Sequence, residues 1–130
     1  HVKTLIIGGM RNWCRNVIEW NLASDPNQDP HTEGGCSECL GAITINGSSV
    51  SRNPAYYIIA HAAKFVRPGS IRIASTFSST LPNVAFKTPD GKKVMIVLND
   101  SQLDQIFQLA TGDTSLTYAL KAGAVATFVW

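Results

Sequence analysis

The sequence lacks a long hydrophobic run and carries little net charge. No apolar stretch approaches the ~20 residues that a helix needs to cross a bilayer, and we expect no signal peptide at its start. Eleven basic and nine acidic residues give a formal net charge of +2. So small a charge predicts neither nucleic acid nor an anionic membrane as a partner. The 130 residues, 45% of them hydrophobic, have the size and composition of about one globular domain.

Cysteine is also scarce, with Cys14, Cys36 and Cys39 as the three examples. An odd count leaves one thiol unpaired in any scheme within the chain. The Cys-x-x-Cys spacing allows a local disulfide, free thiols or half of a zinc site. Zinc needs four ligands, and Cys14 and His31 are the nearby candidates for the other two. The residues alone leave these three alternatives open.

The stretch Asn16–Cys39 organises the rest of the chain. It begins with an apolar run, Val17–Leu22, that predicts a strand covered on both faces. It continues as a loop over Ala23–Cys39, rich in Asp, Asn, Pro and Gly. Binding residues commonly lie on loops that a rigid strand positions. Trp20 stands where strand becomes loop, so its ring could stack on a flat ligand or fill a core.

Two helices are expected in the first half of the chain. The i, i+3, i+4, i+7 spacing of Val2, Leu5, Ile6 and Gly9 predicts a helix over Val2–Trp13. Asn53-Pro54 predicts the start of a second helix, with Asn as N-cap and Pro at the first helical position. This helix is expected to run through Phe65 and to end before Pro68-Gly69. His61, in its middle among apolar residues, is interpreted as a core histidine.

Strands are expected elsewhere. Asn46-Gly47 is a strong hairpin signal and predicts paired strands at Ala42–Ile45 and Ser48–Ser51. After Gly69 the pattern becomes short strands between turns, as in all-β units. The predicted strands are Ser70–Thr76, Asn83–Thr88, Lys93–Asn99, Gln105–Leu109, Ser115–Leu120 and Val125–Trp130. Their turns are expected at Pro89-Asp90-Gly91, Gly112-Asp113 and Gly123.

The chain therefore divides into an α/β part, residues 1–69, and an all-β part, residues 70–130. The first part holds one buried strand between two helices. One strand cannot form a sheet, because its backbone groups need partners on both sides. We therefore expect this part to need strands that the 130 residues do not contain.

Several motifs resemble the C-terminal part of glycoside hydrolase family 30, and the bacterial glucosylceramidase-like β-glucosidases within it. The similarity covers nearly the whole chain, and two of its segments are together specific for the family: Glu19-Trp20-Asn21-Leu22-Ala23 and His61–Ser70 (HAAKFVRPGS). It is carried by Arg11-Asn12-Trp13, Glu19–Ala23, Gly34–Gly41, Tyr56–Ile73 and Pro89-Asp90-Gly91 with the strand that follows.

The resemblance implies the fold and the chemistry. The family fold is a (β/α)8 barrel with a β-sandwich at its side, so Val2–Trp13 would be barrel helix 7, Val17–Leu22 strand 8 and Asn53–Phe65 helix 8. Residues 70–130 would form the antiparallel sandwich. The family hydrolyses β-glycosides with retention, using two glutamates that lie outside this chain. The chain would therefore hold no catalytic residue, no metal and no cofactor. Glu19, Glu33 and Glu38 match no catalytic position.

The resemblance also assigns part of a sugar pocket. Trp20 matches a family tryptophan that lines the glucose subsite, and His31 and Glu33 are the loop residues expected to contact hydroxyls. Cys36 and Cys39 would form a local loop disulfide. The expected partners are a β-glucoside and the N-terminal barrel portion of the same protein, which we expect to be secreted or periplasmic. Glucosylceramide, steryl glucosides, aryl glucosides and β-1,6-glucans all remain possible substrates.

Two other functions compete with this hypothesis. Residues 70–130 could act as a stand-alone carbohydrate-binding sandwich, which a surface row of aromatic side chains would favour. The candidate aromatics mostly fit buried strand faces instead. A zinc or redox module centred on Cys36 and Cys39 would show stoichiometric metal or a titratable thiol pair.

Overall fold

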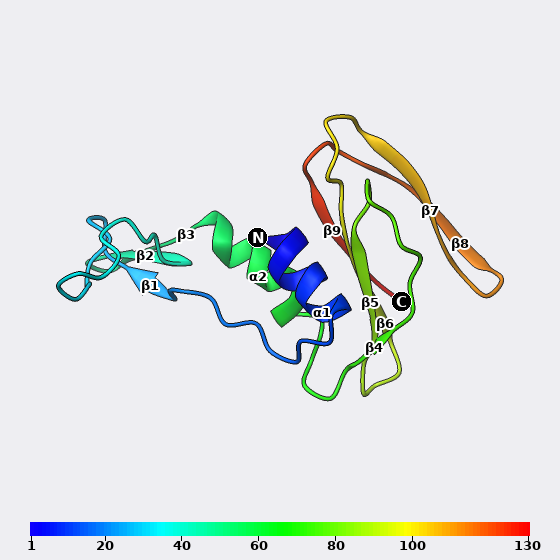
Figure 1. Cartoon of the computed structure of the whole chain (residues 1–130), viewed down its shortest axis with the longest axis horizontal. Coiled ribbons are helices and arrows are strands. Elements are labelled where there is room, and N and C mark those ends of the chain that lie inside the picture. The colour runs from blue at the N-terminus through cyan, green and yellow to red at the C-terminus, as the bar shows by residue number, and fades with distance from the viewer.

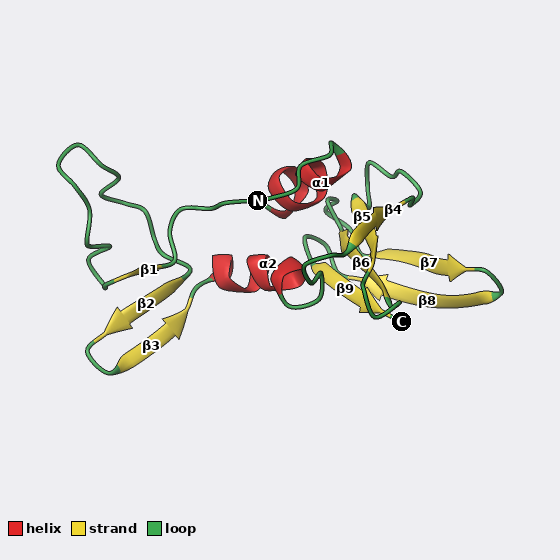
Figure 2. Ribbon diagram, turned by 90° about the horizontal axis from the view of Figure 1, so that it is seen from below, coloured by secondary structure: helices red, strands yellow, loops and turns green.

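The computed structural model describes all residues, 1–130, as an elongated molecule with three parts (Figures 1 and 2). A looped arm lies at one end, the helices lie in the middle, and most of the strands lie at the other end. The helices are η1 (Val2–Gly8), α1 (Gly9–Arg11) and α2 (Pro54–Ala63). The strands are β1 (Ala23–Ser24), β2 (Ile43–Asn46), β3 (Ser49–Arg52), β4 (Ile71–Ile73), β5 (Asn83–Lys87), β6 (Lys93–Leu98), β7 (Gln105–Thr111), β8 (Thr114–Leu120) and β9 (Val125–Val129).

The first helix is wound differently from the prediction. It starts at Val2 as a π-helix and continues into the short α1, which ends at Arg11. Its buried residues are Val2, Ile6 and Ile7, whereas Leu5 is 40% exposed. A π-helix bonds residue i to i+5 and has a longer turn than an α-helix. The inward face therefore follows a spacing of four to five residues, and the predicted place of Leu5 on that face is wrong.

Helix α2 begins at Pro54, as its sequence predicts, and ends at Ala63, two residues before the predicted end. The side chain of Asn53 does not cap the helix. Its Nδ2 instead donates hydrogen bonds to the carbonyl oxygen of Gly41 at 2.7 Å and to Thr44 Oγ1 at 2.9 Å. No helix in the structure combines the length and hydrophobicity that a membrane span needs.

A four-stranded antiparallel sheet, in the order β4-β5-β6-β9, forms the centre of the second half. The β5–β6 hairpin turns at Pro89-Asp90-Gly91, where the positive φ of +85° at Gly91 favours glycine. Val84 pairs with Ile96 in this hairpin, and both are almost fully buried. One face of the sheet packs against the helices through a core of six buried residues: Val2, Ile6, Ile7, Val84, Phe86 and Ile96.

The other face of the sheet lies against a separate hairpin, β7–β8. Phe107 and Tyr118 from the hairpin meet Phe128 from β9 edge to face, with ring centroids 5.1–6.3 Å apart. Such edge-to-face packing is the favoured arrangement for aromatic rings. A cavity of about 530 Å³ remains between hairpin and sheet, lined by Ala85, Met95 and Leu109 among others. The molecule thus has three layers here: helices, sheet and hairpin.

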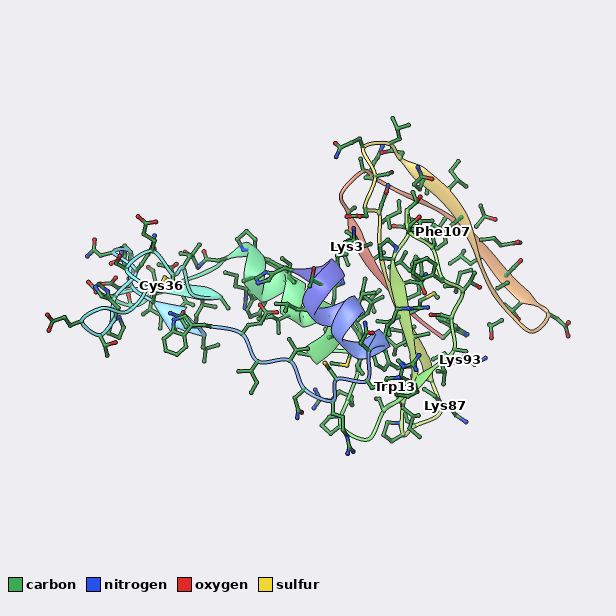
Figure 3. All side chains as sticks on the ribbon, viewed as in Figure 1. Lys3, Trp13, Cys36, Lys87, Lys93 and Phe107 are labelled. Carbon is green, nitrogen blue, oxygen red and sulfur yellow. A yellow bond between two sulfur atoms is a disulfide. The ribbon has the colours of Figure 1, made fainter.

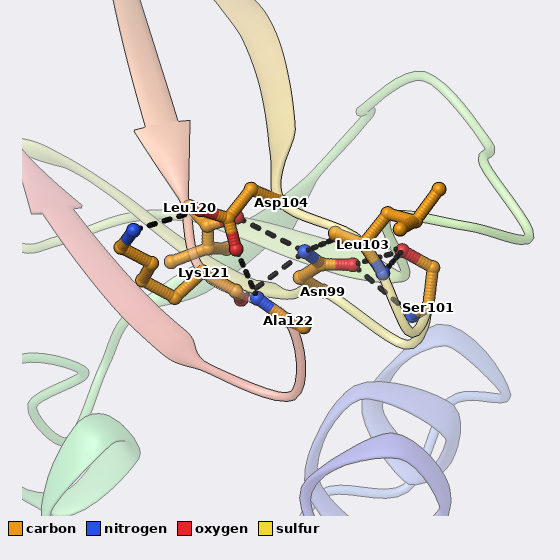
Figure 4. A network of polar contacts seen from close by, with 7 residues as sticks. All are labelled: Asn99, Ser101, Leu103, Asp104, Leu120, Lys121 and Ala122. Carbon is orange, nitrogen blue, oxygen red and sulfur yellow. Dashed lines mark hydrogen bonds and ion pairs between the residues drawn. The ribbon is translucent and has the colours of Figure 1, made fainter.

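A buried amide joins the ends of these strands (Figure 4). Asn99, at 0% exposure, donates from Nδ2 to the carbonyl oxygens of Leu103, Leu120 and Lys121 at 2.8–3.1 Å. Its Oδ1 accepts hydrogen bonds from the backbone N–H and the hydroxyl of Ser101. Because one side chain satisfies several backbone groups, it fixes the corner after β6 to the connection between β8 and β9.

The predicted strand over Val17–Leu22 is wrong for this structure. The only strand near it is the two-residue β1, which pairs in parallel with β2. The carbonyls of Asn21 and Leu22 accept bonds from the N–H groups of Ala42 and Ile43, on one side only. No strand lies on the other side, so the segment stays extended without a ladder, and Ile18 is 94% exposed.

The overall architecture is mostly β, with antiparallel sheets and few helices. The expected antiparallel sandwich is present, whereas the helix–strand–helix part is not itself a piece of closed barrel. The core of Val2, Ile6 and Ile7 with Val84, Phe86 and Ile96 also draws on both sides of the predicted boundary between residues 69 and 70. The division into two domains stays a prediction.

Candidate functional site

The loop between Trp20 and Gly41, here called the arm, is the candidate site, and its two ends are held together at the base. Figure 3 shows Cys36 at the same end of the molecule as the β1-β2-β3 sheet, away from the four-stranded sheet and the β7–β8 hairpin. The Gly41 N–H donates to Ser24 Oγ at 3.1 Å. A Cβ at residue 41 would lie 2.7 Å from Asn21 Oδ1 and 2.8 Å from the Ala23 Cα, so only glycine fits there. The base of the arm is therefore closely packed although the arm itself is exposed.

Asp25 builds the first turn of the arm. Its Oδ1 accepts hydrogen bonds from the N–H groups of Asn27 at 2.8 Å and Asp29 at 2.9 Å. Its own N–H donates to the Asp29 carbonyl at 2.8 Å. Asp side chains commonly hold turns by bonding the backbone two or more residues further on. The next peptide bond, Asp29–Pro30, is cis.

His31 and Glu33, the predicted hydroxyl-binding residues, both lie exposed on the arm. His31 Nδ1 lies 2.7 Å from Asp29 Oδ1, with both side chains partly exposed. Glu33 makes no side-chain hydrogen bond or ion pair. The imidazole of His31 thus has a side-chain partner in Asp29, whereas the carboxylate of Glu33 has none.

Trp20 stands at the base of the arm and is 79% exposed. Within this chain its ring fills no core, and its role at a sugar stays a prediction. Its peptide bond to Asn21 is cis. Asn21 Oδ1 is buried without a hydrogen-bond partner, near the position that a Gly41 Cβ would occupy. No contact in the structure joins Trp20 to His31 or Glu33.

The cysteines have separate roles. Cys36 and Cys39 form a disulfide within the arm, and Cys14 is an exposed free thiol near the helices. Of the three alternatives that the spacing allowed, the structure contains the disulfide. No group of three or more His, Cys, Asp and Glu side chains is placed to hold a metal ion.

A second feature is a groove of about 1,040 Å³ between the helices and the segment that leads into the arm. Its lining is mostly apolar and includes Met10, Val17 and Ile59. Glu19 points one carboxylate oxygen at His1 Nε2, at 3.0 Å, while its Oε1 is buried without a partner. Arg72 Nε in the same lining is also buried without a partner. Buried polar atoms without hydrogen-bond partners are costly, and this chain alone supplies no partner for these two atoms of the groove.

The titratable groups with clear shifts lie in the helix and sheet layers. Burial lowers the pKa of His61, whose Nδ1 lies 2.8 Å from Thr127 Oγ1 on β9. The Lys92 ammonium lowers the pKa of the Asp90 carboxyl, and the Lys121 ammonium lowers that of Asp104. His61 thus ties α2 to the sheet, in agreement with its interpretation as a structural histidine.

Sequence reasoning missed Asp25 and Asp29 as residues that shape the arm. The signal for Asp25 was present, because Asp-Pro-Asn is a turn-forming sequence in which the Asp side chain bonds the backbone. Nothing in the sequence indicated that Asp29 would pair with His31, since the contact depends on how the arm is folded.

Comparisons with known proteins agree with this geometry. Residues 69–128 match the glycosyl hydrolase family 30 beta sandwich domain. These residues belong to that family. The endo-1,6-β-D-glucanase neg1 of Aspergillus fumigatus is 34% identical over 100 residues, which are 72% of this chain and 20% of the relative. The lysosomal acid glucosylceramidase of Mus musculus is 29% identical over 86% of this chain and 22% of the relative.

Among solved structures, the endo-β1,6-glucanase BT3312 superposes with a TM-score of 0.88 at 33% identity, over 99% of this chain and 30% of that chain. The similarity to BT3312 thus extends over the arm and the helices as well as the sandwich. The chain spans about a fifth of the length of the relatives named above.

Proposed function

We propose that this chain is the C-terminal part of a retaining β-glycoside hydrolase of family 30 and supplies one wall of its sugar-binding cleft. The observation that carries the proposal is the superposition of 99% of this chain on the endo-β1,6-glucanase BT3312, and Trp20, at the base of the arm, is the aromatic candidate for the sugar. Sugar rings present C–H patches that an aromatic plate binds, while the hydroxyls bind polar side chains. His31 and Glu33 on the arm are the polar candidates.

The rest of the barrel is the proposed partner of the groove. Val2–Arg11, residues 17–22 and α2 would be barrel helix 7, strand 8 and helix 8. The apolar lining of the groove and the 94% exposed Ile18 support this, because surfaces of that kind are normally covered. Neighbouring strands would also give residues 17–22 the ladder that they lack here. The buried free oxygen of Glu19 would then find a donor.

The bond cleavage itself is assigned to residues outside this chain. Retention requires two carboxyl groups about 5–5.5 Å apart across the scissile bond, one acting as acid/base and the other as nucleophile. Glu19 is bonded to His1 inside the groove, and by the family resemblance neither Glu33 nor Glu38 matches a catalytic position. The chain alone is therefore expected to be inactive, and its contribution is to hold the sugar.

The first substrate to test is a β-1,6-glucan, since two of the relatives described above are endo-1,6-β-glucanases. Glucosylceramide is the second, because of the similarity to the lysosomal acid glucosylceramidase. A secreted or periplasmic location is part of the proposal. The Cys36–Cys39 disulfide supports it, because disulfides persist in oxidising compartments.

The test is Trp20→Ala in the complete protein that carries this chain. We expect kcat/KM on the β-glucoside to fall roughly 10- to 100-fold, as for the loss of an aromatic contact of about 1.5–3 kcal/mol, with an unchanged melting temperature. The matched control is Phe77→Ala, which removes an aromatic ring of similar exposure (76%) from the sandwich side. Equal kinetics for Trp20→Ala and the wild type would remove Trp20 from the site.

A stand-alone carbohydrate-binding sandwich is not supported by the position of the aromatic rings. Phe107, Tyr118 and Phe128 pack against one another between the hairpin and the sheet, and Phe86 is in the core. Phe77 is the most exposed aromatic side chain in the second half. A single ring does not form the row that a flat carbohydrate-binding face needs.

A further inference from the structure

We infer that Asp29 is a positioning residue that holds the His31 imidazole with a proton on Nδ1, so that Nε2 is presented to a hydroxyl group of the sugar. The inference rests on the proposed function and adds a residue and an atom to it. Its starting point is the 2.7 Å contact between His31 Nδ1 and Asp29 Oδ1. A carboxylate can only accept a hydrogen bond, so Nδ1 must be the donor.

The tautomer follows from this contact. With the proton of a neutral imidazole on Nδ1, Nε2 carries the lone pair and accepts a hydrogen bond. The two ring nitrogens lie on different edges of the ring, and no protein group bonds His31 Nε2. The free nitrogen, on an exposed loop, can therefore bond a hydroxyl group. Sugar hydroxyls are the donors that a β-glucoside offers to such a group.

Asp29 is itself held in place, which makes the pair more than a chance surface contact. Its N–H donates to Asp25 Oδ1 at 2.9 Å, and its carbonyl accepts from the Asp25 N–H at 2.8 Å. Both contacts use the backbone of Asp29 and leave its side chain free for His31. Asp25 thus fixes Asp29, and Asp29 fixes His31, in a chain of contacts within the first turns of the arm.

Glu33, unlike His31, has no such series of contacts to hold its side chain. It lies two residues after His31 on the same exposed loop but has no hydrogen-bond or ion-pair partner. A side chain that must be ordered on binding loses rotamer entropy, which reduces the affinity that its contact supplies. Of the two predicted hydroxyl-binding residues, His31 is therefore the one that is pre-organised.

The experiment is a double-mutant cycle in the complete protein, with Asp29→Ala, His31→Ala and both together. Because the backbone of Asp29 keeps its bonds to Asp25, removal of its carboxylate leaves the turn intact. We expect Asp29→Ala to raise KM about 10-fold, as for a lost charge-assisted hydrogen bond, with kcat within about twofold. In the His31→Ala background it should change nothing further, because Asp29 acts through His31. Asp113→Asn, in the turn between β7 and β8, is the acidic control.

A spectroscopic measurement distinguishes the loss of His31 positioning from a general disturbance of the fold. Nitrogen NMR of the 15N-histidine-labelled protein is expected to show the Nδ1–H form of His31 in the wild type and a shift toward the Nε2–H form in Asp29→Ala. Asp29→Asn, whose amide can donate as well as accept, should give a mixture and an intermediate KM.

Additive effects in the cycle, or an Nε2–H ring in the wild type, would overturn the inference. An active wild type with an unaffected Asp29→Ala variant would do the same while leaving the proposed function standing. A complete protein that hydrolyses no β-glucoside would instead remove the proposed function, whatever the tautomer of His31.

Discussion

The arm and the sheet layers of this molecule are ordered by different forces. In the sheet layers, Ile96, Val84 and Val94 are at most 1% exposed, so the burial of apolar side chains holds the strands. In the arm, Ser24 and Gly41 are the only buried residues. Its order comes from backbone bonds at the base, from the Asp25 turn and from the Cys36–Cys39 disulfide. A loop held through its backbone keeps its side chains free to bind a ligand.

The role of apolar burial in the sheet layers is tested most strongly by Ile96→Ala. Ile96 has 0% exposure and lies in the core between helices and sheet. We expect the free energy of unfolding to fall by about 2–5 kcal/mol, the usual cost of such a cavity. Ile106→Ala, on the outer face of β7 at 74% exposure, is the matched control and should change stability by less than about 0.5 kcal/mol. Similar losses for the two variants in urea unfolding would contradict the three-layer packing.

The next effect is expected from Asn99→Ala. The substitution leaves the carbonyls of Leu103, Leu120 and Lys121 without their donor, and buried unsatisfied groups cost about 1–3 kcal/mol. The melting temperature should fall accordingly. Gln108→Ala removes an exposed amide bonded to Ser115 Oγ and should leave the melting temperature nearly unchanged. An equally large fall in the melting temperature for Gln108→Ala would show that the buried hydrogen bonds of Asn99 stabilise the protein no more than an exposed one does.

Removal of the disulfide should affect the arm alone. For the double variant Cys36→Ser with Cys39→Ser, we expect faster amide exchange over residues 32–41 and no change in the sheet. The loop that the bridge closes is short, so its contribution is expected to be below about 2 kcal/mol. Hydrogen exchange measured by mass spectrometry distinguishes the two regions. Faster exchange in β5 and β6 would mean that arm and sheet are coupled.

The smallest effect concerns pH. Burial lowers the pKa of His61 in the folded state, so the unfolded state binds the proton more readily. Stability should therefore be constant above the ordinary histidine pKa of about 6.5 and fall as the pH drops below it. His61→Gln should remove this fall between pH 7 and pH 5. Thermal melts of both proteins check it, and identical pH profiles would show that His61 does not contribute.

Much of the sheet could be predicted because its signals are local. The Pro89-Asp90-Gly91 turn is present as expected. The alternation of Val84 and Phe86 predicts one buried and one exposed face for β5, and this is wrong: Asn83 and Ala85 are buried as well, because the β7–β8 hairpin lies over the second face of the sheet. The Asn46-Gly47 hairpin and the helix start at Pro54 are confirmed within one residue. The confirmed turns and the helix start depend on turn and capping chemistry, which is visible in a short stretch of sequence.

The features that escaped prediction depend on distant partners. Residues 17–22 have the composition of a buried strand, but a strand forms only where neighbours supply the ladder, and this chain supplies one side. The π-winding of Val2–Gly8 depends on packing against β5 and β6 rather than on propensity. For the site, Trp20, His31 and Glu33 were identified through a family resemblance and stay predictions. The Asp29–His31 contact appears only once the arm is folded.

The most direct test of the account is hydrolysis of a β-1,6-glucan oligosaccharide, followed by proton NMR of the released anomer. We expect the 130-residue chain to be inactive and the complete protein that carries it to release the β-anomer first, as retention requires. Hydrolysis by the chain alone, first release of the α-anomer, or no action of the complete protein on any β-glucoside would contradict it.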